Sequence, residues 1–365
     1  MIGTIVGVGV FGIPFSFAKA GFVTGFLFLL GVGALSLAVN LMFGEVVLRT
    51  GEHHQFTGYT RTYLNSGFKI LAAFAWFFSL YGALLAYLII SGNFLFNIFI
   101  SQFYLSPFVY SILFFIFVAL AVLAGLRTVA WFELFMVGFF TLIALLVFIF
   151  GFPEIDLANL NTLFNKEFWF LPYGVLLFAY AGFSSIPVQK EILGANSDFL
   201  KKAIVWGTLF PAVLYLLFTV TVVGVSGDAT SPDAISGLVD FFDHRIIFLL
   251  SLFGLLAITT SFLALCWALI ETFRFDYSFR RLSSWALAVF IPLFLFLLGV
   301  RNFVEVIALA GSVAIGLEGA ILVLLYKKAK VSGDRIPEYS VSFPNWLLYL
   351  MIILFVIGAG YALVN

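Results

Sequence analysis

Long apolar runs, separated by short polar stretches, make up most of this chain. About 20 consecutive apolar residues are enough for a helix to cross a bilayer. Eleven runs meet this length when their ends are placed at charges, glycines and prolines. The predicted spans are 2–19, 23–48, 68–100, 108–126, 129–151, 169–191, 200–225, 246–273, 282–300, 302–327 and 344–364. This pattern predicts an all-α polytopic membrane protein with one domain, residues 1–365.

The first and sixth spans are predicted to break inside the membrane. The run Met1–Pro14 holds four glycines and ends in proline, and the run Gly182–Pro187 combines glycine, two serines and proline. A backbone polar group freed in hydrocarbon costs several kcal/mol, roughly, unless a partner satisfies it. Broken membrane helices therefore usually line an enclosed cavity. Small residues that let helices pack closely are the alternative explanation.

The spacing of the two breaks indicates a repeat. Spans 1 and 6 lie five spans apart, so the two helices cross the membrane in opposite directions. That arrangement is typical of an inverted repeat of five helices in secondary transporters, with the substrate near the breaks. The predicted halves are residues 2–151 and 169–327, and 344–364 is an extra helix.

Both breaks are free of charged side chains. Neither the segment from Met1 to Ala18 nor that from Phe168 to Gln189 contains one. Helix N-termini attract carboxylates, and helix C-termini expose carbonyls that suit an ammonium group or a small cation. A zwitterionic amino acid with a neutral or apolar side chain, aromatic ones included, matches such a site.

Composition and charge narrow the function further. The chain is 63% hydrophobic and 10% charged, which excludes an ordinary soluble protein and makes the lipid bilayer its surroundings. The net charge is zero, so no nucleic-acid partner is expected. One cysteine and three histidines supply no metal cluster or haem, and no cofactor is predicted. Oligomeric state stays open.

Basic residues predict the orientation. With the N-terminus in the cytoplasm, the outer side holds only Lys19, Lys166, Arg245 and Arg301, and the rest of the 18 basic residues fall inside. Cytoplasmic loops are the ones enriched in Lys and Arg. We therefore expect a multi-pass protein of the cell (inner or plasma) membrane with a cytoplasmic N-terminus.

Several motifs resemble one superfamily. The run Tyr81–Gly92 is similar to the G-A-x-x-x-Y-L-I-x-x-G pattern of the amino acid/auxin permease branch. The run Phe178–Glu191 is similar to the sixth helix of that branch, and Thr260–Leu263 resembles the T-S-F-L of bacterial aromatic amino acid permeases. With the first span, they resemble the amino acid–polyamine–organocation (APC) superfamily. The resemblance implies the LeuT-type 5+5 inverted-repeat fold.

The resemblance also implies which residues bind the substrate. Backbone amides would meet its carboxylate at Val8, Gly9 and Val10. Backbone carbonyls would meet its amine near Ile5, Phe178 and Ala181. Side chains would surround it at Phe78, Tyr81, Phe183 and Ser184. Because the chain has 49 Phe residues, lipid contact or core packing is the commoner role for any single aromatic.

A coupling-cation site is implied between the first and eighth spans. LeuT-type sodium symporters combine carbonyls of span 1 with a carbonyl and two hydroxyls of span 8, and the matching residues are Gly3, Val6, Ala257, Thr260 and Ser261. The three on span 8 share one helical face. Oxygen ligands without formal charge suit Na⁺, a hard cation. Hydroxyls that bond back to their own helix are the alternative.

Three alternatives remain to be weighed: proton coupling, a membrane enzyme and a channel. Proton coupling needs a titratable group in the membrane. Glu318 is the best candidate, well inside the tenth span but short of its centre. A polytopic enzyme would need clustered catalytic groups, and a channel would need repeated pore helices, and neither pattern is present. The sequence therefore predicts an Na⁺-coupled amino acid symporter, with a proton-coupled permease as the alternative and an enzyme or channel as remote ones.

Overall fold

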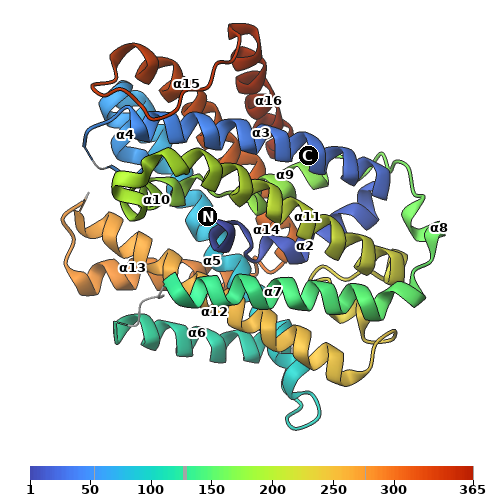
Figure 1. Ribbon diagram of the computed structural model, residues 1–365. Coiled ribbons are helices and arrows are strands. Elements are labelled where there is room, and N and C mark those ends of the chain that lie inside the picture. The colour runs from blue at the N-terminus through green and yellow to red at the C-terminus, as the bar shows by residue number, and fades with distance from the viewer. Residues whose placement is uncertain (53, 126–129, 276, 365) are drawn as a thin grey trace.

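The computed structural model describes residues 1–52, 54–125, 130–275 and 277–364, and within these ranges it contains helices and no strands. Figure 1 shows the long helices side by side as one bundle, with the N-terminus near its middle. The longer helices are α2 Gly9–Ala20, α3 Phe22–Leu48, α5 Ser66–Phe99, α6 Pro107–Leu123, α7 Ala130–Gly151, α11 Leu200–Ser226, α12 His244–Phe275, α13 Arg281–Leu297, α15 Gly316–Ser332 and α16 Asn345–Val364. The shorter ones are α1 Ile2–Ile5, α4 Phe56–Tyr63, α8 Leu157–Leu160, α9 Leu171–Ala179, α10 Ile186–Leu193 and α14 Phe303–Leu309. Single turns of other helix types lie at Phe152–Glu154, Phe183–Ser185, Gly194–Phe199, Gly227–Ala229, Ser236–Leu238 and Ala310–Ile315.

Each predicted span corresponds to one helix or to one interrupted helix among the described residues. Spans 1 and 6 are the interrupted pairs α1–α2 and α9–α10, and α14 and α15 form span 10. The fourth span ends at α6 and the fifth begins at α7; the predicted ends at 126 and 129 lie outside the described residues. The prediction of an all-helical, multi-pass membrane protein is confirmed.

Side-chain caps define where several of these helices begin. Asn65, Ser106 and Asn302 accept a hydrogen bond from the backbone N–H three residues later, at 3.3, 3.4 and 3.3 Å respectively. Such caps satisfy backbone donors that have no partner inside the helix. Pro107 follows Ser106 at the first helical position, where its missing N–H costs nothing.

Helices of the two halves pack against each other across the bundle. α3 packs on α11, α5 on α12, and α2 on α9, which pairs each helix with its counterpart five spans later. Within the second half, glycine permits a still closer contact: a Cβ on Gly311 would lie 1.9 Å from the carbonyl oxygen of Gly174. Span 10 and span 6 therefore touch backbone to backbone. At this contact, span 10 contains a π-helical turn, Ala310–Ile315.

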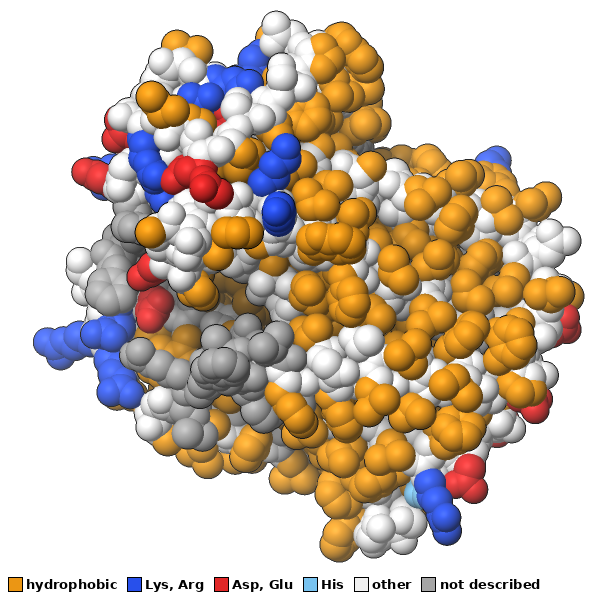
Figure 2. All heavy atoms as spheres, in the orientation of Figure 1, with side chains coloured by type: hydrophobic (Ala, Val, Ile, Leu, Met, Phe, Trp, Pro, Cys, Tyr) orange, Lys and Arg blue, Asp and Glu red, His pale blue; other side chains and the backbone are white. Residues whose placement is uncertain are grey.

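The outer surface of the bundle is apolar. Figure 2 shows hydrophobic side chains covering most of the face in view, with charged groups gathered towards its edges. Exposed side chains of this kind include Leu27, Phe117, Trp206 and Phe294. Such a surface suits contact with lipid. Figure 2 also shows a hollow on the left, where basic and acidic side chains gather.

The segment that follows span 10 runs back over the end of α3. The carboxylate of Glu45, which is fully buried, accepts hydrogen bonds from Ser340 Oγ at 2.9 Å and from the Val341 amide at 2.7 Å, and pairs with Arg49 at 2.8 Å. The Tyr339 hydroxyl donates to the carbonyl of Leu41 at 2.8 Å. Burial raises the pKa of this hydroxyl, so it stays a neutral donor. These contacts define a strap, residues 333–343.

Candidate functional site

The first span breaks at Val6–Val8. α1 ends at Ile5, and the Gly7 amide bonds to the Ile5 carbonyl at 2.8 Å across Val6, whose φ of −75° and ψ of 77° form an inverse γ-turn. The break thus lies within the predicted run Met1–Pro14, but at its Val6–Val8 part and not at the Gly12–Pro14 end. Pro14 lies inside continuous α2, as proline in membrane helices can when neighbouring groups satisfy the backbone.

The sixth span breaks between α9 and α10, as predicted. α9 ends at Ala179, and a single 3-10 turn, Phe183–Ser185, precedes α10. Pro187 lies in the first turn of α10, where a helix has no use for the missing N–H. The hydroxyl of Ser185 donates to the carbonyl of Gly182 at 2.8 Å, so a side chain satisfies part of the interrupted backbone.

The two breaks meet each other directly. A Cβ on Gly9, the first residue of α2, would lie 2.8 Å from the Cα of Ala179, the last residue of α9. The buried hydroxyl of Tyr215, on α11, lies 2.6 Å from the carbonyl oxygen of Ile5 and 2.9 Å from that of Ala179. One side chain thus connects the C-terminal ends of α1 and α9.

A cavity of about 90 Å³ lies beside these breaks. Seven of the predicted substrate-site residues line it, namely Ile5, Val8, Gly9, Phe178, Ala181, Phe183 and Ser184. The other lining residues are Thr4, Gly7, Trp76, Ser79, Leu80, Ala83, Tyr87, Ala179, Leu265, Ile315 and Glu318. Among these lining residues, Glu318 alone has an ionisable acidic or basic side chain of the Asp, Glu, Lys, Arg or His type. The cavity therefore offers mainly apolar and aromatic walls.

Not every carbonyl that was expected to receive the amine is free for it. The Ile5 carbonyl already accepts from Gly7 and Tyr215, and the Phe178 carbonyl accepts from the Ala181 amide at 3.2 Å. The Val10 amide points back to the Gly7 carbonyl at 3.4 Å. Hence the main-chain groups with room for a substrate are those around Val8, Gly9 and Ala181.

Two predicted residues of span 3 lie away from the cavity. The Phe78 ring packs on Phe74, and the Tyr81 hydroxyl donates to the carbonyl of Leu287 on α13 at 3.2 Å. In a helix, successive residues are turned by about 100°, so positions 78 and 81 share no face with 76, 80, 83 and 87. The cavity-facing stripe of α5 is that second set, with Ser79 at its edge.

The sequence interpretation missed three side chains of this stripe: Trp76, Ser79 and Tyr87. Trp76 and Tyr87 share one helical face with Leu80 and Ala83, at spacings of four, three and four residues, and Ser79 lies at the edge of this face. A Cβ on Gly7 would lie 3.6 Å from the Tyr87 hydroxyl, so this tyrosine borders the first break. The family resemblance implied Tyr81 as a wall residue instead, six residues earlier on the same helix.

Glu318 lies nearer to the substrate cavity than the sequence suggested. It is 1% exposed and forms part of the cavity wall. Its Oε1 accepts a hydrogen bond from Ser79 Oγ at 3.0 Å, and its Oε2 has no hydrogen-bond partner within the described part of the chain. An orphan buried carboxyl oxygen is costly, which marks this residue as one with a functional role.

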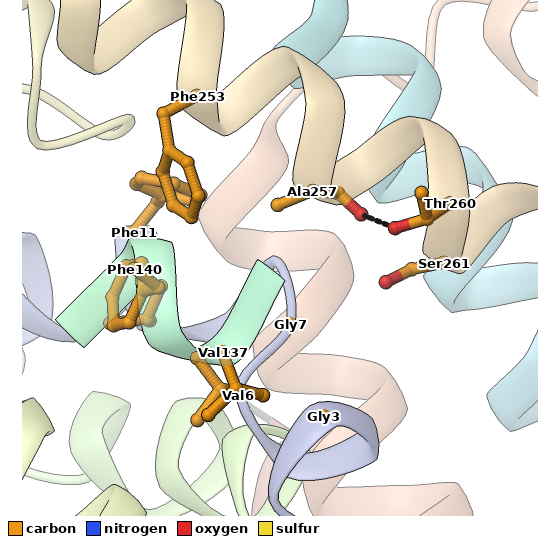
Figure 3. A pocket seen from close by; sticks show the side chains of 11 residues that line it. Gly3, Val6, Gly7, Phe11, Val137, Phe140, Phe253, Ala257, Thr260 and Ser261 are labelled. Carbon is orange, nitrogen blue, oxygen red and sulfur yellow. Dashed lines mark hydrogen bonds between the residues drawn. The ribbon is translucent and has the colours of Figure 1, made fainter. Parts of the chain in front are cut away.

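A second, smaller cavity of about 20 Å³ separates α1 from α12. All five residues implied for the cation line it, namely Gly3, Val6, Ala257, Thr260 and Ser261. Figure 3 shows the two hydroxyl side chains of α12 on one side of this space and the first broken helix on the other. The volume suits one water-sized particle.

The hydroxyl of Thr260 is engaged within its own helix. It donates to the carbonyl of Ala257 at 2.9 Å, as Figure 3 shows. A hydroxyl that donates keeps lone pairs that can accept or ligate. The remaining walls are apolar, with Phe11, Phe140 and Phe253 around the space. The Val10 side chain also lines this cavity rather than the larger one.

Comparison with known proteins agrees with this architecture. A model of the tryptophan/tyrosine permease family matches residues 1–362. Glutamine transporter 2 of Aliivibrio fischeri (strain ATCC 700601 / ES114) is 24% identical over 342 residues, 89% of this chain and 87% of that protein. The crystal structure of MhsT in complex with L-phenylalanine superposes with a TM-score of 0.66 at 15% identity, covering 98% of this chain and 96% of that one. The match to MhsT, a LeuT-fold transporter, confirms the predicted fold.

Proposed function

The chain belongs to the tryptophan/tyrosine permease family, and we propose that it is a secondary active symporter of neutral or apolar amino acids, aromatic ones included. It is a multi-pass membrane transporter of amino acids and not an enzyme. The observation that carries the choice of substrate is the lining of the 90 Å³ cavity, which combines main chain at two helix breaks with apolar and aromatic side chains.

The lining explains why an acidic side chain would be excluded. Glu318 is the sole Asp, Glu, Lys, Arg or His among the residues that line the cavity, so an acidic substrate side chain would meet no cation. An unpaired charge in such surroundings costs several kcal/mol, roughly. Aromatic rings at Trp76, Phe178 and Phe183 instead offer contact area to an apolar or aromatic side chain.

Sodium is the coupling ion that we favour. The small cavity is lined by all five residues implied for the cation, Gly3, Val6, Ala257, Thr260 and Ser261, and its size suits a single ion. It adjoins the Val6 turn, so an ion there would stabilise the broken conformation of span 1. Proton coupling is the second candidate, because Glu318 is buried in the wall of the substrate cavity itself.

We place the N-terminus in the cytoplasm and the protein in the cell membrane. The basic residues Lys190, Lys327 and Lys330 lie at the end of the bundle that carries the strap. An excess of Lys and Arg is typical of the cytoplasmic face of a membrane protein. The strap would then be cytoplasmic. Alternating access would move the first and sixth spans against the remaining helices.

Uptake by purified protein in liposomes tests this function. Tyrosine, tryptophan, leucine and phenylalanine should be taken up saturably under an inward sodium gradient and should compete with one another, while glutamate should not compete. Flux that never saturates would indicate a channel. Uptake driven by a pH gradient in sodium-free buffer would replace sodium with the proton.

A further inference from the structure

The carboxyl group of Glu318 is incompletely satisfied at a place where a substrate can reach it. Ser79 Oγ lies 3.0 Å from Oε1 and 3.0 Å from the carbonyl oxygen of Trp76, so these two acceptors share one proton, whereas Oε2 has no hydrogen-bond partner among the described residues. Leaving a buried acceptor unpaired costs about 1–3 kcal/mol. A donor on a bound molecule would remove that cost.

No positively charged side chain of the cavity lining can occupy the Glu318 carboxyl group in place of a substrate donor. Around it the cavity is lined by Trp76, Leu265 and Ile315, and no Lys, Arg or His belongs to the lining. The carboxyl group is therefore a polar spot in an apolar and aromatic wall. Binding sites of this composition use the polar group to select and orient a ligand.

The position of the carboxyl group relative to the helix breaks determines which part of a substrate meets it. Tyr87 borders Gly7 at the first break, and Ser79 holds Glu318. These two residues lie eight positions apart on α5, about 12 Å at 1.5 Å per residue. An amino acid with its carboxylate at the break keeps its amine at that same end, because the amine is one carbon away. Only its side chain extends towards Glu318.

We propose that Glu318, held by Ser79, determines specificity by accepting a hydrogen bond from a donor at the far end of the substrate side chain. Suitable donors are the indole N–H, the phenol O–H and the carboxamide N–H of an otherwise neutral side chain. This proposal rests on the proposed function, because it requires the amino acid to lie in the 90 Å³ cavity. Side chains of similar shape without a donor leave Oε2 unpaired and bind more weakly.

Equilibrium binding to the purified full chain tests the proposal, because binding does not depend on the coupling step. The probes are three pairs: tyrosine and phenylalanine, tryptophan and 1-methyltryptophan, glutamine and methionine. In at least one pair, the donor-bearing member should bind about tenfold more tightly, as sites built around a donor reject analogues without it. Glu318→Leu should bring that ratio to within about twofold and keep the affinity for the donor-free member.

Matched variants separate recognition from folding. Glu305→Leu changes an exposed carboxyl group on α14, at the far end of the same span, and should keep the wild-type ratio. Glu318→Gln keeps one carbonyl acceptor and should give an intermediate ratio. If Glu318→Leu does not fold, the wild-type ratio and the Glu318→Gln ratio still decide.

Three results would overturn the proposal. If the wild type binds both members of every pair equally well, the site does not recognise a side-chain donor. An equal loss for both members in a folded Glu318→Leu protein would place Glu318 at the amine or in the scaffold. If Glu318→Leu keeps the wild-type affinity ratio but loses transport, Glu318 would be assigned to proton coupling. If no amino acid binds the wild type at all, the proposed function itself fails.

Discussion

The hydroxyl of Tyr215 lies 2.6 Å from the carbonyl oxygen of Ile5. The same hydroxyl lies 2.9 Å from the carbonyl of Ala179, so the C-terminal ends of both half-helices share one donor. A hydroxyl has one proton, and the two carbonyls compete for it. The link therefore holds α1 and α9 together through a single shared proton, while the Ile5 carbonyl also accepts from the Gly7 amide.

Replacing Tyr215 with phenylalanine should lower both stability and uptake. The change leaves two buried carbonyls without this donor, at a cost of about 1–3 kcal/mol. Tyr110→Phe is the matched control, because that hydroxyl also donates to one backbone carbonyl, of Phe103 at 2.9 Å, away from the breaks. Melting temperature and initial uptake rate would be measured for both. Equal effects of the two changes would contradict a special role for the link.

Enlarging Gly9 should impair transport by separating the two broken helices. A Cβ there would lie 2.8 Å from the Cα of Ala179, and a backbone atom cannot rotate away. Gly9→Ala should already reduce uptake and melting temperature, and Gly9→Val should reduce them further. Gly31→Ala is the control, since a Cβ at Gly31 meets no atom within 4 Å. Wild-type uptake by Gly9→Val at normal expression would refute this.

This explanation differs from the one that the sequence favoured. The family resemblance implied that the backbone amide of Gly9 meets the substrate carboxylate, so that an added side chain would obstruct the substrate. The structure shows an earlier obstacle, since the Cβ meets Ala179, which lies 170 positions away in the chain. Glycine requirements set by distant backbone cannot be read from local spacing.

Much of the architecture was predictable because the bilayer fixes the length of each apolar run. The position of the first break was not, since four glycines and Pro14 offered several places and the helix tolerates proline. The substrate face of α5 was also unpredictable. This 34-residue helix is apolar on nearly every side, so the pattern did not distinguish Tyr81 from Tyr87. The Tyr215 link joins residues 210 positions apart and leaves no local signal.

Removing the carboxyl group of Glu45 should loosen the strap. Glu45→Ala leaves Arg49 unpaired and takes the acceptor from Ser340 and Val341, and breaking a buried pair costs about 3–5 kcal/mol. Melting temperature should fall, and limited proteolysis should cut within residues 333–343 sooner.

The control for the strap is Glu338→Ala. Glu338 pairs with Arg335 in the same segment, but this pair is more exposed and should contribute less than about 1 kcal/mol. Equal protease sensitivity in the two variants would show that the buried carboxylate does not hold the strap.

Orientation can be tested with single cysteines. The native Cys266 is buried, so a membrane-impermeant thiol reagent should report only the added residue. Ser332→Cys, at the exposed end of α15, should react only from the cytoplasmic side, and Asp240→Cys, exposed before α12, only from outside. The reverse pattern would invert the topology and the sides assigned to the strap.

The two hydroxyls of the small cavity should control the sodium requirement. Thr260→Ala combined with Ser261→Ala removes two oxygens that line the space, so the sodium concentration for half-maximal uptake should rise at least tenfold, or uptake should cease. Thr259→Ala is the matched control: its hydroxyl donates to Leu255 at 2.6 Å on the same helix and does not line the cavity. If uptake needs no sodium, is unaffected by the double change and stops in Glu318→Gln, the coupling ion is the proton and not sodium.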